Sequence, residues 1–287
     1  MVVYYTAYFV TEIDSLLQID DTIALKPNII IAPGYSQLAP VFNKLSEVAT
    51  KLQGFAAADI IADNVQAALT ARASGVFNTT SQAVVLCYPT IERYNTHENI
   101  NDIIALSVHW AAAKVLRDTQ KGYWLSPSNT ELIGVIGLSA KITSSLTDPT
   151  ADTNLLNGQG VVTVFRKSGS GTRLWGNWTA AFPSDKTTTA MIAPRAVRMA
   201  IREALIDSSL DHLDRNVTQI TIDLIVEDVN AFIRTLVGSG VIIDGECVYN
   251  AEKNPSTELA QGKIIFTYYV KFAPSTERIT FEEIVEF

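Results

Sequence analysis

The stretch Asn28-Ile29-Ile30-Ile31-Ala32-Pro33-Gly34 decides the fold class. Its apolar run is short, β-branched and closed by a proline and a glycine, which is the pattern of a buried strand. An amphipathic helix follows, because apolar residues then recur at helical spacing, at Leu38, Val41, Phe42, Leu45, Val48 and Leu52. A buried strand joined directly to a helix of this length indicates a parallel βαβ unit.

The same alternation extends along the chain on both sides of this unit. Toward the C-terminus, residues 55–61 and 82–88 predict two more apolar strands, with a helix over residues 65–73 between them. Residues 1–10 are apolar and aromatic but have neither a basic leader nor a cleavage site, so we predict a strand there rather than a signal peptide. The first part of the chain is therefore expected to form a parallel sheet of buried strands.

The middle of the chain combines one apolar helix with polar loops. Residues 102–118 are apolar on nearly all sides, which predicts an internal helix with Asp102 as its N-cap. Ser, Asn, Thr, Asp and Gly dominate residues 121–130 and 143–160, which indicates two long loops. Two strands are expected to flank the second loop, over residues 132–142 and 161–166.

The last third of the chain changes to helices and alternating strands. Pro194 suits the first turn of a helix that runs to about Leu205. Residues 220–237 predict a second helix, although residues 219–225 also alternate and leave a strand there as the alternative. Apolar residues alternate with others over residues 263–272, and further strands are expected over residues 240–249 and 278–287, which indicates an antiparallel sheet.

These elements predict an α/β core with parallel βαβ units, followed by a C-terminal antiparallel α+β region. We place the domain boundary after residue 142, so that residues 1–142 form one domain and residues 143–287 form the other. A chain of 287 residues is long enough for one large domain or for two smaller ones with cores of their own.

The charge of the chain argues against nucleic acid as a partner. Acidic residues outnumber basic ones by 30 to 22, which gives a net charge of −8, whereas nucleic-acid binders concentrate Lys and Arg to neutralise phosphates. No apolar run reaches the roughly 18 residues of a membrane span, so we expect no membrane insertion. The two cysteines, Cys87 and Cys247, lie far apart, which favours a reducing compartment.

No arrangement of reactive side chains indicates catalysis. The chain contains no G-x-S-x-G nucleophile motif, and its three histidines lack the spacing of zinc ligands: His97, His109 and His212. The glycine-rich residues 168–172 lack the lysine and the spacing of a phosphate loop, so a hairpin turn is the simpler interpretation. We therefore predict no catalytic residue, no metal site and no cofactor.

Five segments share a further pattern. The first two are residues 26–34 (KPNIIIAPG) and residues 122–129 (GYWLSPSN) with 133–135 after them. The third joins residues 155–157 and 161–164 to the aromatic sequence LWGNWT at 174–179. The fourth is residues 232–240, and the fifth runs from Asn254-Pro255 through residues 263–272 to 281. In this order the segments resemble contractile tail sheath proteins, including the sheaths of R-type pyocins and of other contractile injection systems.

The resemblance implies a structural role without catalysis. Sheath subunits form a six-fold helical cylinder around a tail tube, join a baseplate, and contract to drive the tube through a cell envelope. The location implied is the tail of a virion or injection particle, after assembly in the bacterial cytoplasm. The family carries a longer region before the first segment, so we expect a chain truncated on its N-terminal side and monomeric by itself. A soluble α/β hydrolase or nucleotide binder with a β appendage is the alternative, and a tube or baseplate component is a third reading.

The resemblance also assigns residues. The positions that match the family's motifs are Pro33, Gly34, Ser126, Pro127, Asn129, Asn157, Trp175, Gly176 and Thr179. Terminal arms of sheath proteins add strands to the sheet of a neighbour, which implies intersubunit strand exchange by Lys263, Ile265, Thr267, Tyr269, Lys271, Arg278, Thr280 and Glu282. The family's corresponding helix faces the tube, which implies tube contacts by Glu227, Asp228 and Arg234.

Overall fold

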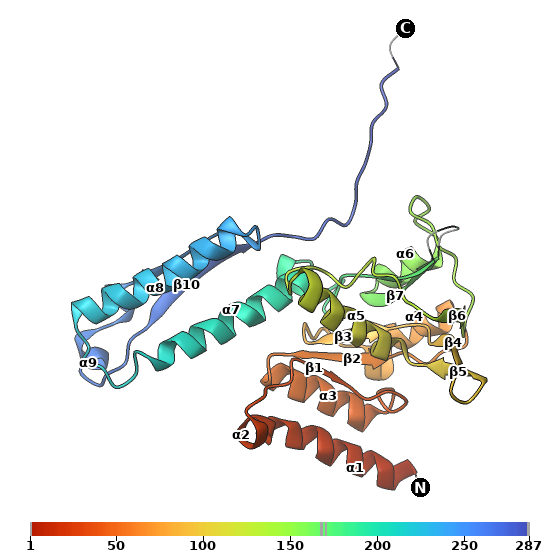
Figure 1. Ribbon diagram of the computed structural model, residues 1–287, viewed down its shortest axis with the longest axis horizontal. Coiled ribbons are helices and arrows are strands. Elements are labelled where there is room, and N and C mark those ends of the chain that lie inside the picture. Colours follow the sequence, from red (N-terminus) through yellow and green to blue (C-terminus); the bar gives the residue numbers. More distant parts are fainter. Residues whose placement is uncertain (1, 167–168, 170, 286–287) are drawn as a thin grey trace. The chain divides into compact units, whose positions relative to one another are not determined.

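The computed structural model of the chain describes residues 2–166, 169 and 171–285 (Figure 1). Its contacts divide the chain into two compact units, Met1–Arg195 and Ala196–Phe287. The boundary expected after residue 142 does not coincide with this division, because residues 161–175 contribute two strands to the sheet of the first unit.

A five-stranded sheet in the order β1-β2-β3-β7-β8 forms the centre of the first unit. Neighbours from β1 to β7 are parallel, and β8 is antiparallel to β7. The strands are β1 (Ile29–Ile31), β2 (Phe55–Asp59), β3 (Val84–Cys87), β7 (Val161–Arg166) and β8 (Thr172–Trp175). The predicted parallel βαβ units are confirmed, and all residues of β2 and β3 are buried, as continuous apolar runs require.

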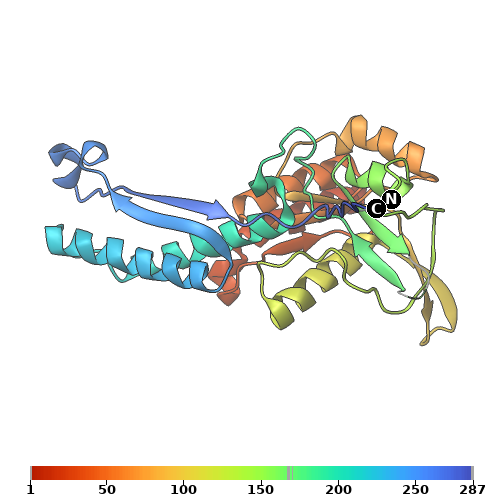
Figure 2. The same ribbon diagram turned by 90° about the horizontal axis from the view of Figure 1, so that it is seen from above.

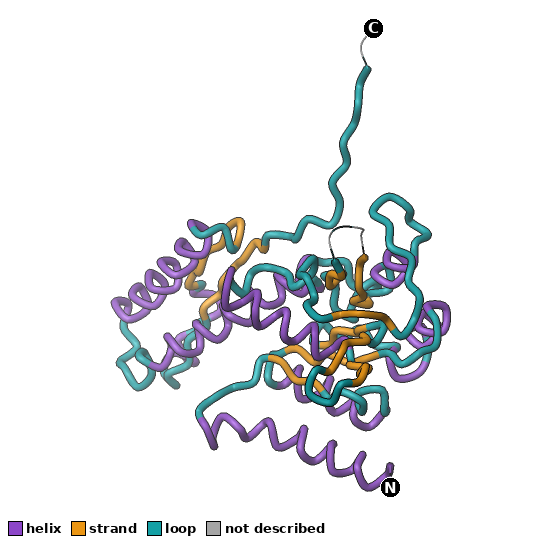
Figure 3. The backbone as a smooth tube through the Cα atoms, turned by 45° about the vertical axis from the view of Figure 1, so that its right-hand side comes forward, coloured by secondary structure: helices purple, strands orange, loops and turns teal. Residues whose placement is uncertain are grey.

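Helices cover both faces of β1 and β2 (Figure 1). On one face, Val41 and Leu45 of α3 pack with Ala56 of β2. On the other face, the Trp110 ring of α5 meets the Phe55 ring with centroids 5.8 Å apart, since successive strand residues point to opposite sides. Figure 3 shows the strands of this unit surrounded by helices and loops. The helical elements are α3 (Ala39–Lys51), α4 (Val65–Ala73), η2 (Gly75–Phe77), α5 (Leu106–Lys121), α6 (Asp152–Asn157) and η3 (Thr188–Ala190).

The N-terminal residues form a helix, so the strand predicted over residues 1–10 is wrong. α1 (Val2–Ser15) continues into η1 (Leu16–Gln18) and α2 (Ile19–Ile23). The apolar residues Phe9, Ile13 and Leu17 recur at helical spacing and pack against the cluster under α3. The first ten residues are too short a window to separate this period from that of a strand.

The helix predicted over residues 102–118 starts later than expected and is buried on one side only. Residues 100–104 form β5 (Ile100–Ile104), which with β4 (Ile91–Asn95) and β6 (Val135–Leu138) makes an antiparallel sheet in the order β5-β4-β6. Asp102 accepts from Asn95 Nδ2 at 2.7 Å across this sheet and is no N-cap. On α5, Val115 is 56% exposed, so the helix has an outward face as well.

A carboxylate from β2 caps α5 instead. Asp59 is buried at the end of β2, where its Oδ1 accepts from the Ser107 N–H at 2.8 Å and its Oδ2 accepts from Ser107 Oγ at 2.5 Å. The Asp59 N–H donates in turn to Ser36 Oγ at 3.0 Å. Burial raises the pKa of Asp59, while the bonds from Ser107 oppose that rise. Asp59 therefore ties β2 to α5 through its carboxylate and to the turn after β1 through its backbone N–H.

The polar loops follow the prediction in part. Residues 122–130 contain no helix or strand, whereas residues 143–160 contain the short helix α6. The Asp152 carboxylate accepts from the N–H and the hydroxyl of Thr143, each at 2.8 Å. These bonds close the loop on itself and place α6 beside β7.

A single buried cation connects the irregular parts of the first unit. Arg72 of α4 is 5% exposed, and its guanidinium donates to four backbone carbonyls, those of Phe77, Gln159, Ala180 and Phe182, at 2.8–3.1 Å. Burial lowers the pKa of this guanidinium. The segment that leaves β8 is thereby held against α4 and the end of α6.

The second unit is a helical hairpin with a two-stranded sheet. α7 (Ile192–Leu210) begins in the first unit, and α8 (Gln219–Gly238) follows, capped by the Thr218 hydroxyl, which accepts from the Thr221 N–H at 3.2 Å. The predicted helix over residues 220–237 is confirmed, and the alternative strand over 219–225 is wrong. The remaining elements are β9 (Ile242–Tyr249), η4 (Ala251–Lys253), α9 (Ser256–Leu259) and β10 (Phe266–Phe272). β9 and β10 pair antiparallel, as predicted.

The strand predicted over residues 278–287 is absent from the described residues 278–285, and residues 286–287 lie outside them. The segment leaves β10 as an extended chain (Figure 1). Its apolar side chains are exposed, with Phe281 at 92%. A strand is defined by the ladder it joins, and no partner ladder exists within the described part of this chain.

We predict that Arg72→Met destabilises the first unit strongly. The substitution leaves buried carbonyls without donors, and we expect the free energy of unfolding to fall by about 3 kcal/mol or more. Urea unfolding followed by circular dichroism measures this. Gln66→Met, on the exposed side of the same helix, is the control and should change little. An Arg72→Met protein as stable as the control would contradict the proposed role of the cation.

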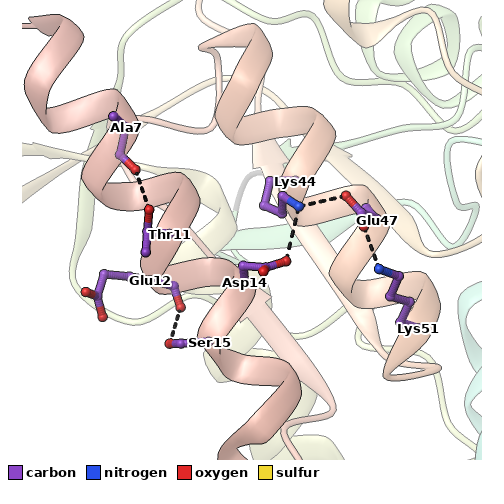
Figure 4. A network of polar contacts seen from close by, with 8 residues as sticks. All are labelled: Ala7, Thr11, Glu12, Asp14, Ser15, Lys44, Glu47 and Lys51. Carbon is purple, nitrogen blue, oxygen red and sulfur yellow. Dashed lines mark hydrogen bonds and ion pairs between the residues drawn. The ribbon is translucent and has the colours of Figure 1, made fainter.

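A charge network joins α1 to α3 (Figure 4). Lys44 Nζ lies 3.1 Å from Asp14 Oδ1 on α1 and 2.9 Å from Glu47 Oε2, and Lys51 Nζ lies 2.6 Å from Glu47 Oε1. The hydrogen bond from Lys51, followed by that from Lys44, holds the pKa of Glu47 at about 2. The pKa of Lys44 is raised, chiefly by Glu47.

This network predicts a defined pH dependence. A carboxyl whose pKa is lowered on folding stabilises the fold fully above its unfolded pKa of 4.5, and this contribution is lost as the pH falls toward about 2. Glu47→Gln should therefore be less stable than the wild type near neutral pH, and the difference should shrink in acid. Urea unfolding across that range, at low salt, measures it. Glu12→Gln, on exposed α1 surface, should show no such trend.

Candidate assembly surfaces

The residues predicted for strand exchange divide between β10 and the tail. Thr267, Tyr269 and Lys271 share one face of β10, opposite Val248, Glu246 and Asp244 of β9. Two more come just before the strand, Lys263 and Ile265, and the backbone N–H and C=O of Ile265 bond the Asn254 side chain at 2.7 and 2.8 Å. The other three lie in the unpaired tail: Arg278, Thr280 and Glu282.

The residues predicted to face the tube lie on the exposed side of α8. Glu227 and Arg234 form an ion pair at 2.5 Å, with both side chains more than 60% exposed. Asp228 points elsewhere, and its carboxylate lies 3.4 Å from His212 Nε2 in the turn before the helix. The adjacent carboxylates thus have separate partners, which leaves a charged surface and no acid–base pair.

Three of the matched motif residues lie together: Asn157, Trp175 and Gly176. Gly176 has φ 131°, and a Cβ there would lie 2.7 Å from the Asn157 side chain and 3.1 Å from Val162 Cα. The Gly176 N–H donates to Ser128 Oγ at 3.0 Å. With its amide oriented to satisfy its neighbours, Asn157 accepts from Trp175 Nε1 at 3.1 Å and donates to Val161 O at 2.9 Å. These residues fix the start of the segment after β8.

The other motif residues shape turns and loops. Asn129 adopts φ 61°, and its N–H donates to Leu174 O at 2.6 Å. Ser126 Oγ accepts from the Ser128 N–H at 3.0 Å, with Pro127 buried between them. The Thr179 hydroxyl, fully buried, donates to Ala190 O at 2.8 Å. Pro33 and Gly34 lie apart from these, exposed in the turn after β1.

Side chains that could bind a metal ion do not cluster in the described part of the chain. No group of three or more His, Cys, Asp or Glu residues is arranged to hold a metal ion there. Cys87 and Cys247 are buried, and burial raises the pKa of both thiols. Burial lowers the pKa of His109. Within the same residues, no helix combines the length and apolar character needed to cross a bilayer.

Asn230, which was not among the predicted residues, connects α8 to β9 in the second unit. It lies on the half-buried side of α8, and its side chain bonds the backbone of Cys247 on β9. The sequence offers one signal, an amide between the apolar residues Val229 and Phe232 of the helix stripe. A buried amide needs partners, but the pattern does not say which.

Two family models cover nearly the whole chain. The central domain of phage tail sheath proteins matches residues 10–180, and their C-terminal domain matches residues 186–286. The chain belongs to the phage tail sheath family. The resemblance seen in the sequence is thereby confirmed. This family is a structural one, so the reading of the chain as a soluble α/β enzyme is set aside.

Individual relatives agree with this assignment. The tail sheath protein of Burkholderia phage BcepMu is 37% identical over 258 residues, which are 88% of this chain and 54% of that protein. The chain therefore spans about half the length of this relative. The contracted helical sheath of the anti-feeding prophage superposes with a TM-score of 0.77 at 17% identity, over 95% of this chain and 73% of that one.

A second solved sheath shares the fold. The contracted PVC sheath complex of an extracellular contractile injection system also gives a TM-score of 0.77 at 17% identity, over 95% of this chain and 74% of that one. The predicted fold class, a parallel α/β core followed by an antiparallel region, is therefore that of contractile sheath subunits.

Proposed function

We propose that this chain is a structural subunit of a contractile tail sheath. It would polymerise as a six-fold helical cylinder around a tail tube, join a baseplate, and contract to drive the tube through a cell envelope. The observation that carries this proposal is the match of both units to sheath domains, together with superposition on contracted sheaths. The site of action is the tail of a virion or injection particle, assembled in the bacterial cytoplasm.

Strand exchange between copies is the contact that links the cylinder. The tail offers an extended segment with exposed apolar side chains, and the second unit offers a sheet of only two strands. A two-stranded sheet is marginally stable alone, and addition of a strand satisfies open backbone groups. The proposed links run through the extended segment after β10, so subunit bodies would turn while they stay connected.

The tube contact is proposed for α8. Glu227, Asp228 and Arg234 present both signs of charge on its outer side. A single exposed ion pair contributes only about 0–1 kcal/mol, but a cylinder repeats the contact in every subunit. The work of contraction is proposed to come from repacking the contacts between copies and the contacts between each copy and the tube. This mechanism requires no catalytic residue, metal or cofactor.

Electron microscopy tests the assembly proposal. The chain, produced with the tail genes of its own genome, should yield cylinders of sheath around a tube. Removal of residues 278–287 should leave folded but dispersed subunits, because the linking strand is gone. Thermal unfolding of the shortened chain controls for folding. Cylinders that form equally well without the tail would contradict strand exchange, and dispersed particles from the intact chain would contradict the sheath function.

Charge reversal on α8 tests the tube contact separately. Glu227→Lys combined with Asp228→Lys should reduce co-sedimentation of the chain with tubes while leaving sheath–sheath association intact, because only the tube-facing charge changes. Asp207→Lys combined with Asp211→Lys, exposed positions outside α8, is the matched control. Unchanged tube binding by the α8 variant at low and at physiological salt would remove α8 from the tube interface.

A further inference from the structure

The helix α8 has a buried side and an exposed side. The buried side contains Ile233 and Leu236. It packs on β9, where a Cβ on Gly245 would lie 3.1 Å from Ile233 Cγ2 (Figure 2). Residues three or four apart lie on the same side of a helix. At this spacing the exposed side presents one line of residues, which we call the outer stripe: Ile220, Leu224, Glu227, Ala231 and Arg234.

The first half of the outer stripe is apolar. Ile220 is 72% exposed and Leu224 is 51% exposed, and the two residues lie one helical turn apart. A single exposed apolar side chain is ordinary on a protein surface. Two in succession on one line of a helix form an apolar strip in contact with solvent, and such strips mark interaction surfaces when polar residues surround them.

Acidic side chains surround this apolar pair. At 3.6 residues per turn, Asp223 and Asp228 fall on either side of the pair, and Glu227 follows it on the stripe. All three acidic residues are exposed. Arg234, the one basic residue of α8, lies further along and bonds Glu227 at 2.5 Å. The stripe thus has the anatomy of a protein interface, an apolar centre with a charged rim, and the sign of that rim is negative.

The negative charge of the chain is concentrated in the second unit. Residues 196–287 contain fifteen Asp or Glu residues and eight Lys or Arg residues, whereas residues 1–195 contain fifteen and fourteen. A second copy would therefore meet the outer stripe with a unit of like charge or with a unit that is nearly neutral. Neither complements an acidic rim. The charges favour a different protein as the partner, with Lys and Arg on its surface.

We infer that the outer stripe of α8 binds a basic partner surface with an apolar centre, which in the proposed assembly is the outer wall of the tail tube. This inference rests on the tube contact proposed above and adds the chemistry of the partner. Burial of Ile220 and Leu224 supplies the affinity, and the acidic rim orients the contact. Because salt screens only the rim, part of the tube binding should persist at high salt.

Removal of the apolar centre tests the inference. Ile220→Gln combined with Leu224→Gln keeps every charge and the helix propensity, and it should lower the affinity for tubes about tenfold or more in co-sedimentation. The tubes are assembled from the tube protein of the same genome. Ile206→Gln combined with Leu210→Gln, exposed at the same spacing on α7, is the matched control and should bind like the unsubstituted chain. Equal binding by the two variants would overturn the apolar centre.

Asp223→Lys tests the sign of the charge on the partner. Against a basic tube surface, this variant should bind about threefold or more weakly at low salt, and the difference should shrink as salt is added. Glu252→Lys makes the same change in net charge at an exposed position of η4 and should bind like the unsubstituted chain. Binding by Asp223→Lys that equals or exceeds that of Glu252→Lys would overturn the basic partner.

The same measurements separate this inference from the proposed function. If the unsubstituted chain does not co-sediment with tubes, the tube contact itself fails. If charge reversal at Glu227 and Asp228 abolishes tube binding but the Gln pair on α8 and Asp223→Lys bind like their controls, only the inference fails. If the Gln pair on α8 weakens association of the chain with itself in sedimentation velocity and leaves tube binding unchanged, a second copy covers the stripe, which also overturns the inference.

Discussion

Arg72 donates to four backbone carbonyls of the first unit, which come from η2, from the end of α6 and from the segment after β8. A buried cation without an opposite charge is costly, and these dipoles are what makes it tolerable. The bonds fix the course of the chain after β8, through Ala180 and Phe182, and α7 starts a few residues later. The parallel sheet supplies the bulk of the core, but the course of the chain from β8 to α7 depends on the Arg72 guanidinium.

The second unit has the opposite character. Its sheet has two strands, of which β9 is bonded to the side chains of Asn230 and Asp244, and residues 278–285 join no ladder within the described part of the chain. Such a unit stores unsatisfied backbone groups at one edge and unsatisfied apolar side chains in one segment. The strand exchange proposed above would satisfy both at once.

The parallel strands could be predicted from sequence because burial on both faces leaves continuous apolar runs such as residues 84–87. The helix at residues 2–15 could not, since its apolar period shows only when Ile13 and Leu17 are included. Asp102 was misassigned because an N-cap pattern looks the same whether the carboxylate bonds a helix or a neighbouring strand. Asp59, Arg72 and Asn230 bond backbone groups far away in the chain, and no local pattern records such partners. The tail has the alternation of a strand, but no ladder within the described residues includes residues 278–285.

In the strand exchange proposed above, a subunit would give a strand from one surface and receive one on another, which would join neighbours head to tail. Contacts of this kind do not cap themselves, so a row of copies linked in this way would end with an unpaired sheet edge on one side and an unpaired tail on the other. The two ends are chemically different, and growth along the row has a direction. Nothing in the contact counts how many copies have been added. In the proposed cylinder, this contact by itself would therefore set no length.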